Sequence, residues 1–300
     1  MATITLTGNT SLSALTTLAN NDTIALAGFT LDINTTTAIT GVSVTTVGTA
    51  GTVTFSSTGV NANLSTWSFT AGTGVLIATV PAGVTIGTVT GGTAANARAV
   101  TTNSGTITNS VGGSGNAAVG VNTNNGTVSN ATGGSAVNAH GISVNSAIVT
   151  NCTGGSISGA HGIGTNNGTV STATGGSTGS ADGVFTNNCV VTTAIGGSGA
   201  STAYGVFSSL GEVFSVTPGT SRAVGSFSGG TKVIFGPTFN GVFTASSTAA
   251  PTTIYSIGAL SGSATIPGGI TVIEVNTGGG GYTYNQVKQL RYKSRSGVMI

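Results

Sequence analysis

The sequence has very little charge: its 300 residues include seven Lys and Arg and five Asp and Glu. Disordered chains usually combine high charge with low hydrophobicity, whereas 38% of these residues are apolar. No helical period is present, and no apolar run approaches the roughly 18 residues of a membrane helix. The first residues also lack the basic and apolar segments of a signal peptide. We therefore expect a chain made in the cytosol, with no membrane contact, that is ordered by pairing of strands.

Cysteine and acidic residues are also scarce. The two cysteines, Cys152 and Cys189, fall at different places in the repeat described below, which predicts free thiols rather than a disulfide. Glycan hydrolysis usually needs two carboxylates several ångströms apart, and the acids of this chain do not pair at close spacing: Asp22, Asp32, Asp182, Glu212 and Glu274. We expect no catalytic residues and no enzymatic activity.

Two histidines occupy one column of the repeat, with an aspartate next in line. His140, His161 and Asp182 follow one another at the constant interval of the repeat, and Arg98 lies two intervals before His140. A metal site would need a third ligand in addition to the histidines. We expect no metal and no cofactor, and we interpret the column as a polar row that faces solvent or a neighbouring subunit.

Glycine, in contrast, is abundant and marks this repeat. A Gly-Gly pair followed by Ser or Thr recurs at a constant interval: Gly91-Gly92, Gly112-Gly113, Gly133-Gly134, Gly154-Gly155, Gly175-Gly176 and Gly196-Gly197. A fixed period of about 21 residues is typical of solenoids, in which each repeat stacks on the next at a rise of about 4.8 Å. The pairs lack the lysine and following helix of a phosphate-binding loop. We interpret them as corners at which glycine supplies a positive φ.

Aligning the repeats predicts a thin core with four small inward positions in each coil. The first column is Ala97, Ala118, Ala139, Ala160 and Ala181, and the second is Val100, Val121, Ile142, Ile163 and Val184. The third is Ile107, Val128, Val149, Val170 and Val191, and the fourth is Ser110, Ala131, Cys152, Ala173 and Ala194. Polar residues on both sides of the third column indicate a strand with alternating faces.

A further column consists entirely of asparagine. It contains Asn103, Asn124, Asn145, Asn166 and Asn187. Asparagine tolerates the left-handed backbone of a corner, and amides stacked about 4.8 Å apart can form a hydrogen-bonded ladder. We predict that this column is a structural ladder.

The repeat suggests four regions. Residues 1–83 are expected to form a β-rich cap and irregular coils, and 84–236 a parallel β-solenoid. The register shifts by one residue after Gly196, and the repeat fades from Pro237 onward. Residues 237–281 are expected to form a C-terminal β region, and 282–300 a basic and aromatic tail.

The segment ALTTLANNDTIALAGFTLDIN at Ala14–Asn34, followed by coils with Gly, Asn and Ser corners and a distinct C-terminal piece, carries a resemblance. It resembles the right-handed parallel β-helix proteins of tailed bacteriophages: tail fibres, tailspikes and capsid-decorating proteins. The resemblance covers about residues 14–236 and rests on architecture. It implies location in the virion, a homo-oligomer with a trimer favoured, contact with other virion proteins, and either a host surface glycan as receptor or reinforcement of the shell.

The C-terminal tail contrasts with the uncharged body. Its aromatic and basic residues include Tyr284, Lys288, Arg291, Tyr292, Lys293 and Arg295. Tyr and Arg are favoured at protein interfaces, so we predict that this tail docks the protein to an assembly. Four basic residues offer few phosphate contacts, which argues against nucleic acid as the partner.

Two other functions fit the composition. A bacterial surface adhesin or surface-layer protein shares the content of Thr, Asn and Gly but would normally carry an export signal. An ice-binding solenoid would present rows of Thr-x-Thr, which Thr106 and Thr108 begin. Ile148 and Val190 interrupt that row. We therefore expect a non-enzymatic structural protein of a phage virion.

Overall fold

The computed structural model of the protein describes residues 1–46, 50–56, 62–198 and 202–217, together with five later strands between 224 and 275. Side chains are described as far as Val213. In these parts the chain consists of short strands and turns, with one 3-10 helix, η1, at Leu12–Ala14. The described residues contain no helix that is long and apolar enough to cross a membrane.

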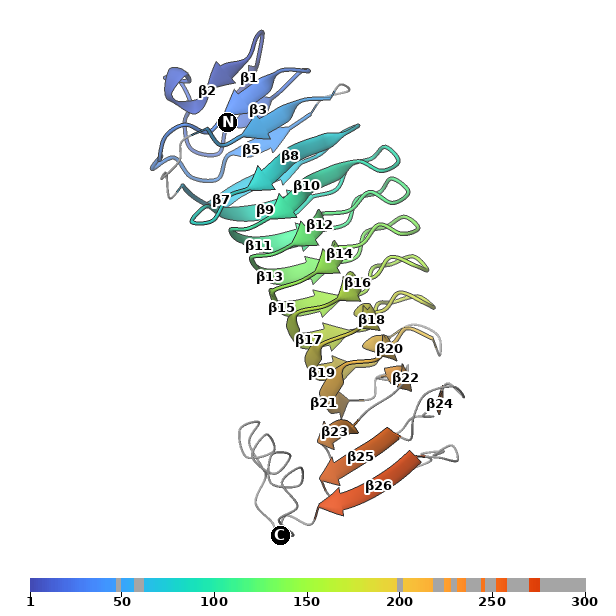
Figure 1. The fold of residues 1–300 in the computed structure, drawn as a ribbon. Helices are drawn as coiled ribbons and strands as arrows, with labels where there is room; N and C mark the ends of the chain where they lie inside the picture. Colours follow the sequence, from blue (N-terminus) through green and yellow to red (C-terminus); the bar gives the residue numbers. More distant parts are fainter. Residues whose placement is uncertain are drawn as a thin grey trace.

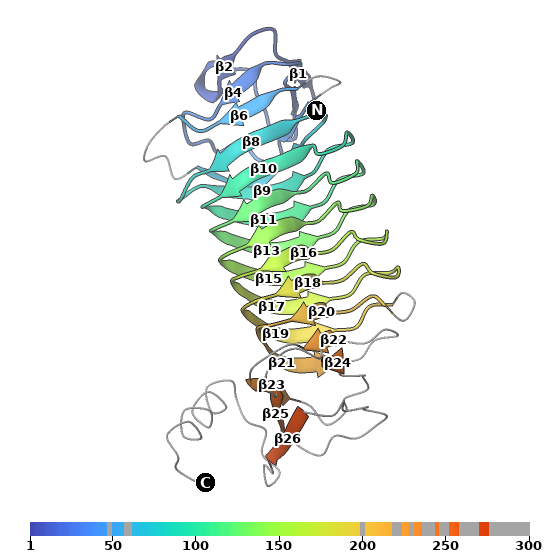
Figure 2. The ribbon, with the colours of Figure 1, turned by 45° about the vertical axis from the view of Figure 1, so that its right-hand side comes forward.

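The strands form two long sheets in which neighbouring strands pair in parallel. Consecutive strands of the chain alternate between the sheets as far as β25, and the last two strands, β25 and β26, pair within one sheet. Figures 1 and 2 show the resulting elongated stack, with the amino terminus at one end. Sheet A has 14 strands: β1 (Thr3–Thr5), β3 (Thr23–Ala25), β5 (Ser43–Thr45), β7 (Asn63–Thr70), β9 (Thr85–Thr90), β11 (Thr106–Val111), β13 (Thr127–Thr132), β15 (Ile148–Thr153), β17 (Thr169–Thr174), β19 (Val190–Ile195), β21 (Glu212–Thr217), β23 (Thr231–Phe235), β25 (Thr252–Ile257) and β26 (Ile270–Val275).

Sheet B has 12 strands and runs beside sheet A along the same stack. Its strands are β2 (Thr10–Ser11), β4 (Thr30–Asp32), β6 (Thr52–Thr54), β8 (Val75–Val80), β10 (Arg98–Asn103), β12 (Val121–Asn124), β14 (Ile142–Asn145), β16 (Ile163–Asn166), β18 (Val184–Asn187), β20 (Val206–Ser209), β22 (Val224–Phe227) and β24 (Thr244–Ala245). The predicted fold class is confirmed: the chain is a parallel β-solenoid of about 10 turns of about 21 residues.

Strand register follows the sequence repeat. Val100 pairs with Val121, and Val121 pairs with Ile142, each one coil further along. The extra residue after Gly196 is absorbed outside the strands, because Val184 pairs with the matching Val206 of the next coil. Pairing also crosses the expected boundary at residue 83, since β7 pairs with β9 and β8 with β10. The first coils therefore share both sheets with the regular body, and the predicted division of the chain into regions stays a prediction.

In the regular coils the four predicted inward columns lie inside, and all of their members are buried. In the six-residue strands of sheet A the two inward positions lie three residues apart, as Val128 and Ala131 show, with two outward residues between them. Larger side chains fill the first coils. Trp67 and Phe69 of β7 are buried there, and the indole Nε1–H of Trp67 donates to the carbonyl oxygen of Ile39 at 2.8 Å.

The Gly-Gly pairs have a different physical cause from the one expected. None of these glycines has a positive φ, and the positive values in the regular coils fall instead at Asn96, Ala117, Asn138, Gly159 and Ser180. Steric overlap explains why both positions of each pair are glycine. A Cβ on Gly112 would overlap the carbonyl oxygen of Ala139, and one on Gly113 would overlap that of Gly92. Glycine is required because adjacent coils approach each other too closely for any side chain.

The asparagine column is a buried ladder. The Nδ2 of each asparagine donates to the Oδ1 of the asparagine in the next coil at 2.8 Å, from Asn103 through Asn187. The last member, Asn187, donates to the hydroxyl of Ser209 at 3.1 Å. None of the five has a positive φ, so the expectation of a left-handed corner at these residues was wrong.

Each ladder amide also closes its own corner. The Oδ1 of Asn145 accepts the N–H of Ala147 at 3.3 Å, and its Nδ2 donates to the carbonyl oxygen of Ala147 at 3.2 Å. One side chain thus replaces the backbone partners that a tight turn cannot provide. A buried polar group is tolerated only when it is hydrogen-bonded in this way.

We predict that Asn145→Ala lowers the free energy of unfolding by about 2–4 kcal/mol, because it leaves buried groups in two neighbouring coils without partners and opens a cavity. The midpoint of urea unfolding measures the loss. Asn151→Ala is the matched control. Asn151 donates an amide hydrogen bond of 3.1 Å to Asn130 on the exposed face, so its removal should cost about 1 kcal/mol or less. Equal losses would contradict a special role for the buried ladder.

Candidate functional site

After each regular strand of sheet A the chain forms a Gly-Gly corner and then a short projecting loop. The N–H of Gly134 donates to the carbonyl oxygen of Ala139 at 2.6 Å and closes the base of one loop. The same bond recurs between Gly155 and Ala160 in the next coil. Because the coils are in register, these loops stack into a row along one edge of the solenoid (Figure 1).

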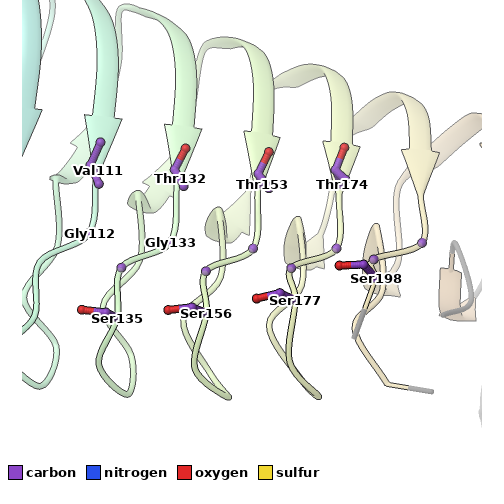
Figure 3. A pocket seen from close by; sticks show the side chains of 17 residues that line it. Val111, Gly112, Thr132, Gly133, Ser135, Thr153, Ser156, Thr174, Ser177 and Ser198 are labelled. Atoms are coloured by element: carbon purple, nitrogen blue, oxygen red, sulfur yellow. The ribbon is translucent and has the colours of Figure 1, made fainter. Parts of the chain in front are cut away.

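A groove of about 760 Å³ runs along the bases of these loops. Figure 3 shows two rows of side chains along it, one from the residue before each Gly-Gly pair and one from the residue after it. The first row is Val111, Thr132, Thr153 and Thr174, and the second is Ser135, Ser156, Ser177 and Ser198. The glycine pairs lie between the rows.

The chemistry of the groove is neutral. Its lining contains hydroxyl groups, one valine and glycine backbone, and no charged residue. Several backbone groups along it are engaged, since the N–H of Gly133 donates to Thr153 at 2.9 Å and that of Ser135 to Gly113 at 3.2 Å. Such a surface can donate and accept hydrogen bonds along an extended neutral ligand. It has no ionisable group for acid–base chemistry.

The groove was not recognised from the sequence. Its signal is present in the alignment of the repeats, where hydroxyl residues precede and follow the Gly-Gly pair in coil after coil. The pattern does not say that a loop projects between the two rows, and the concave surface depends on that loop.

His161 and Asp182 are buried in the wall of the solenoid and His140 is half-buried there, which overturns the expectation of a solvated row. His161 is 6% exposed and Asp182 is 1% exposed. Each side chain in the column accepts the backbone N–H of the next column residue. His161 donates to His140 Nδ1 at 3.2 Å, Asp182 to His161 Nδ1 at 3.1 Å, and Tyr204 to Asp182 Oδ1 at 2.8 Å. These hydrogen bonds hold the side chains against the wall.

Aromatic stacking extends this column along the axis. The imidazole rings of His140 and His161 have centroids 5.1 Å apart, and His161 stacks on Phe185 at 4.7 Å. Phe185 in turn stacks on Phe207 at 5.0 Å. Burial, with a smaller effect from the neighbouring His161, lowers the pKa of His140 to about 4. The described residues contain no group of three or more His, Cys, Asp or Glu side chains that could hold a metal ion.

The described aspartates act as acceptors for the backbone. Asp22 accepts the N–H of Ala2 at 2.6 Å and that of Ala19 at 3.0 Å, and these hydrogen bonds lower the pKa of Asp22. Asp32 accepts the N–H of Ser56 at 3.0 Å. With Asp182, each of these carboxyl groups links one coil to the next.

The predicted docking residues Tyr284, Lys288, Arg291, Tyr292, Lys293 and Arg295 lie outside the described residues. Both cysteines are free, and Cys152 is buried in the core, where burial raises the pKa of its thiol.

The position of His140 predicts a stability that falls in acid. Its pKa of about 4 in the folded protein lies below the unperturbed 6.5, so the unfolded chain binds the proton more tightly. The free energy of unfolding should therefore fall as pH drops from about 6.5 to about 4, by about 3 kcal/mol in all. Urea unfolding at a series of pH values measures the slope.

His140→Asn is the control for this pH dependence. An asparagine Oδ1 can accept the N–H of His161 in place of Nδ1 and does not titrate. The pH dependence should therefore become smaller in this variant, and an unchanged slope would show that another group is responsible.

Comparison with known proteins identifies no relative. No protein-family model, curated protein or solved structure matches the chain. The fold is thus shown by the parallel sheets themselves, and the resemblance to phage proteins continues to rest on the sequence features that suggested it.

Proposed function

We propose that this chain is a non-enzymatic structural protein of a phage virion, of the tail fibre, spike or capsid-decoration type. The observation that carries the proposal is the register of the strands. Parallel pairing continues from β1 to β25 and β26 in sheet A without a change of direction in the described residues. Such a stack is an elongated, stiff element, because each coil is bonded to both neighbours.

The polar groups support a structural role. Asp22 and Asp182, which accept backbone N–H groups at short distances, are used to join coils. The groove has no charged lining. A hydrolase of the tailspike type would need two carboxylates facing one cleft, and the described aspartates are committed to the wall.

The groove is the surface that best fits a receptor contact within this function. Its hydroxyl rows repeat once per coil along the axis (Figure 3), and a neutral host surface glycan presents hydroxyl groups that can pair with them. Oligomerisation, with a trimer favoured, and docking to other virion proteins through residues 282–300 complete the proposal.

Two alternatives make different demands on the surface. A surface adhesin would use the same solenoid and would be exposed on the bacterial cell. An ice-binding protein would need an unbroken array of hydroxyls, and Ile148, which is 53% exposed, interrupts the row that begins at Thr106 and Thr127. That interruption favours the structural role over ice binding.

The proposal is tested by deleting residues 282–300 in the phage that encodes the protein. The truncated protein should keep its strand-rich circular dichroism spectrum, because the described strands of both sheets precede residue 282. It should be lost from purified particles, as measured by immunogold electron microscopy with an antibody to the solenoid.

Replacing Thr169, an exposed residue of β17, by Ala provides the matched control, which should enter particles at the wild-type level. Incorporation of the truncated protein would refute docking by the tail. Immunogold labelling of the wild-type protein on the surface of uninfected bacteria, rather than on particles, would refute the virion role and favour the adhesin.

A further inference from the structure

The Nδ1 atom of His161 faces two atoms of Asp182 at once. The backbone N–H of Asp182 donates to it at 3.1 Å. The carboxylate Oδ2 of the same residue lies 3.2 Å from it. This Oδ2 is buried and has no hydrogen-bond partner among the residues that the structure describes, whereas Oδ1 accepts the N–H of Tyr204 at 2.8 Å. One carboxylate oxygen is therefore satisfied and the other is not.

A neutral imidazole can form a hydrogen bond with only one of these two atoms of Asp182. Its unprotonated nitrogen is an acceptor, so it can take the N–H of Asp182, and its lone pair then lies opposite the lone pairs of Oδ2. A protonated imidazole reverses the pattern. Nδ1–H becomes a donor to Oδ2, in a charge-assisted hydrogen bond, and the N–H of Asp182 loses its acceptor.

We propose that His161 and Asp182 form a pH-sensitive switch between adjacent coils. In acid a proton from solvent adds to Nδ1 of His161. The hydrogen bond from the N–H of Asp182 breaks, and the bond from Nδ1–H to Oδ2 forms. The segment before β18 then loses the hydrogen bond that joins the backbone N–H of Asp182 to His161 in the preceding coil.

The neighbours of His161 explain why we expect His161, rather than His140, to respond to pH in this way. His140 stacks on one side of His161, at 5.1 Å, and Phe185 at 4.7 Å. The carboxyl group stays anchored in both states by the N–H of Tyr204, at 2.8 Å. Arg98, the basic residue of this column, lies two coils before His140. The residue that follows His140 in the column is His161 rather than a carboxylate, so protonated His140 gains no partner of this kind.

Nuclear magnetic resonance of the full chain, labelled with ¹⁵N, tests the switch. During an acid titration of the folded protein, the amide signal of Asp182 should shift in step with the ring signals of His161. The hydrogen-exchange protection of that amide, corrected for the intrinsic effect of pH, should fall about tenfold. The amide of Tyr204 should keep its protection and serves as the internal reference.

Two variants separate the switch from general acid effects. His161→Asn supplies an amide oxygen as acceptor and removes the titration, so the amide of Asp182 should no longer respond to pH. Asp182→Asn keeps an oxygen for Tyr204 but removes the acceptor for Nδ1–H, so the coupled response to acid should be absent. The dispersion of the amide spectrum reports that each variant is folded.

Three results would overturn the proposal. In the first, His161 gains its proton while the amide of Asp182 is unchanged. In the second, the amide of Asp182 still responds in His161→Asn. In the third, His161 remains neutral until the whole solenoid unfolds.

Discussion

The close stacking of identical coils is the constraint on which the rest of the structure depends. Parallel strands pair only when successive coils lie about 4.8 Å apart, and every residue must then tolerate a copy of itself at that distance. Glycine at the paired corners does so because it has no Cβ to meet the next carbonyl. Asparagine does so because its amide is both donor and acceptor, and each copy bonds the next at 2.8 Å.

The same constraint accounts for the scarcity of charge. Like charges stacked in a column would repel each other in a wall of low dielectric, and each would need a partner in its own coil. Where acids do enter the wall, as at Asp182, they accept backbone N–H groups from the next coil. The histidines of the same column accept such groups with Nδ1. The groove accordingly presents neutral hydroxyl rows and no charged residue.

Much of the fold could be predicted from the sequence, because the constant period of the repeat directly reports which residues stack. The inward columns at Ala160 and Val170 and the ladder at Asn145 follow from alignment alone. When the residues of a column differ from coil to coil, the sequence does not predict whether the column is buried or faces the solvent. His161 and Asp182 looked like surface residues because of their polarity, and their burial depends on hydrogen bonds to the backbone that a sequence does not show. The groove depends on loops that project between its two rows, and the pattern does not reveal that projection.

Buried amide hydrogen bonds of the asparagine ladder link successive coils in one direction. Scalar couplings transmitted through hydrogen bonds measure this directly, in protein labelled with ¹³C and ¹⁵N. The structure predicts a coupling from the Nδ2 of Asn124 to the side-chain carbonyl carbon of Asn145, and from Asn145 to Asn166, because each donates at 2.8 Å. Couplings in the opposite direction would contradict the direction of the ladder, and the absence of couplings in a folded sample would contradict the ladder itself.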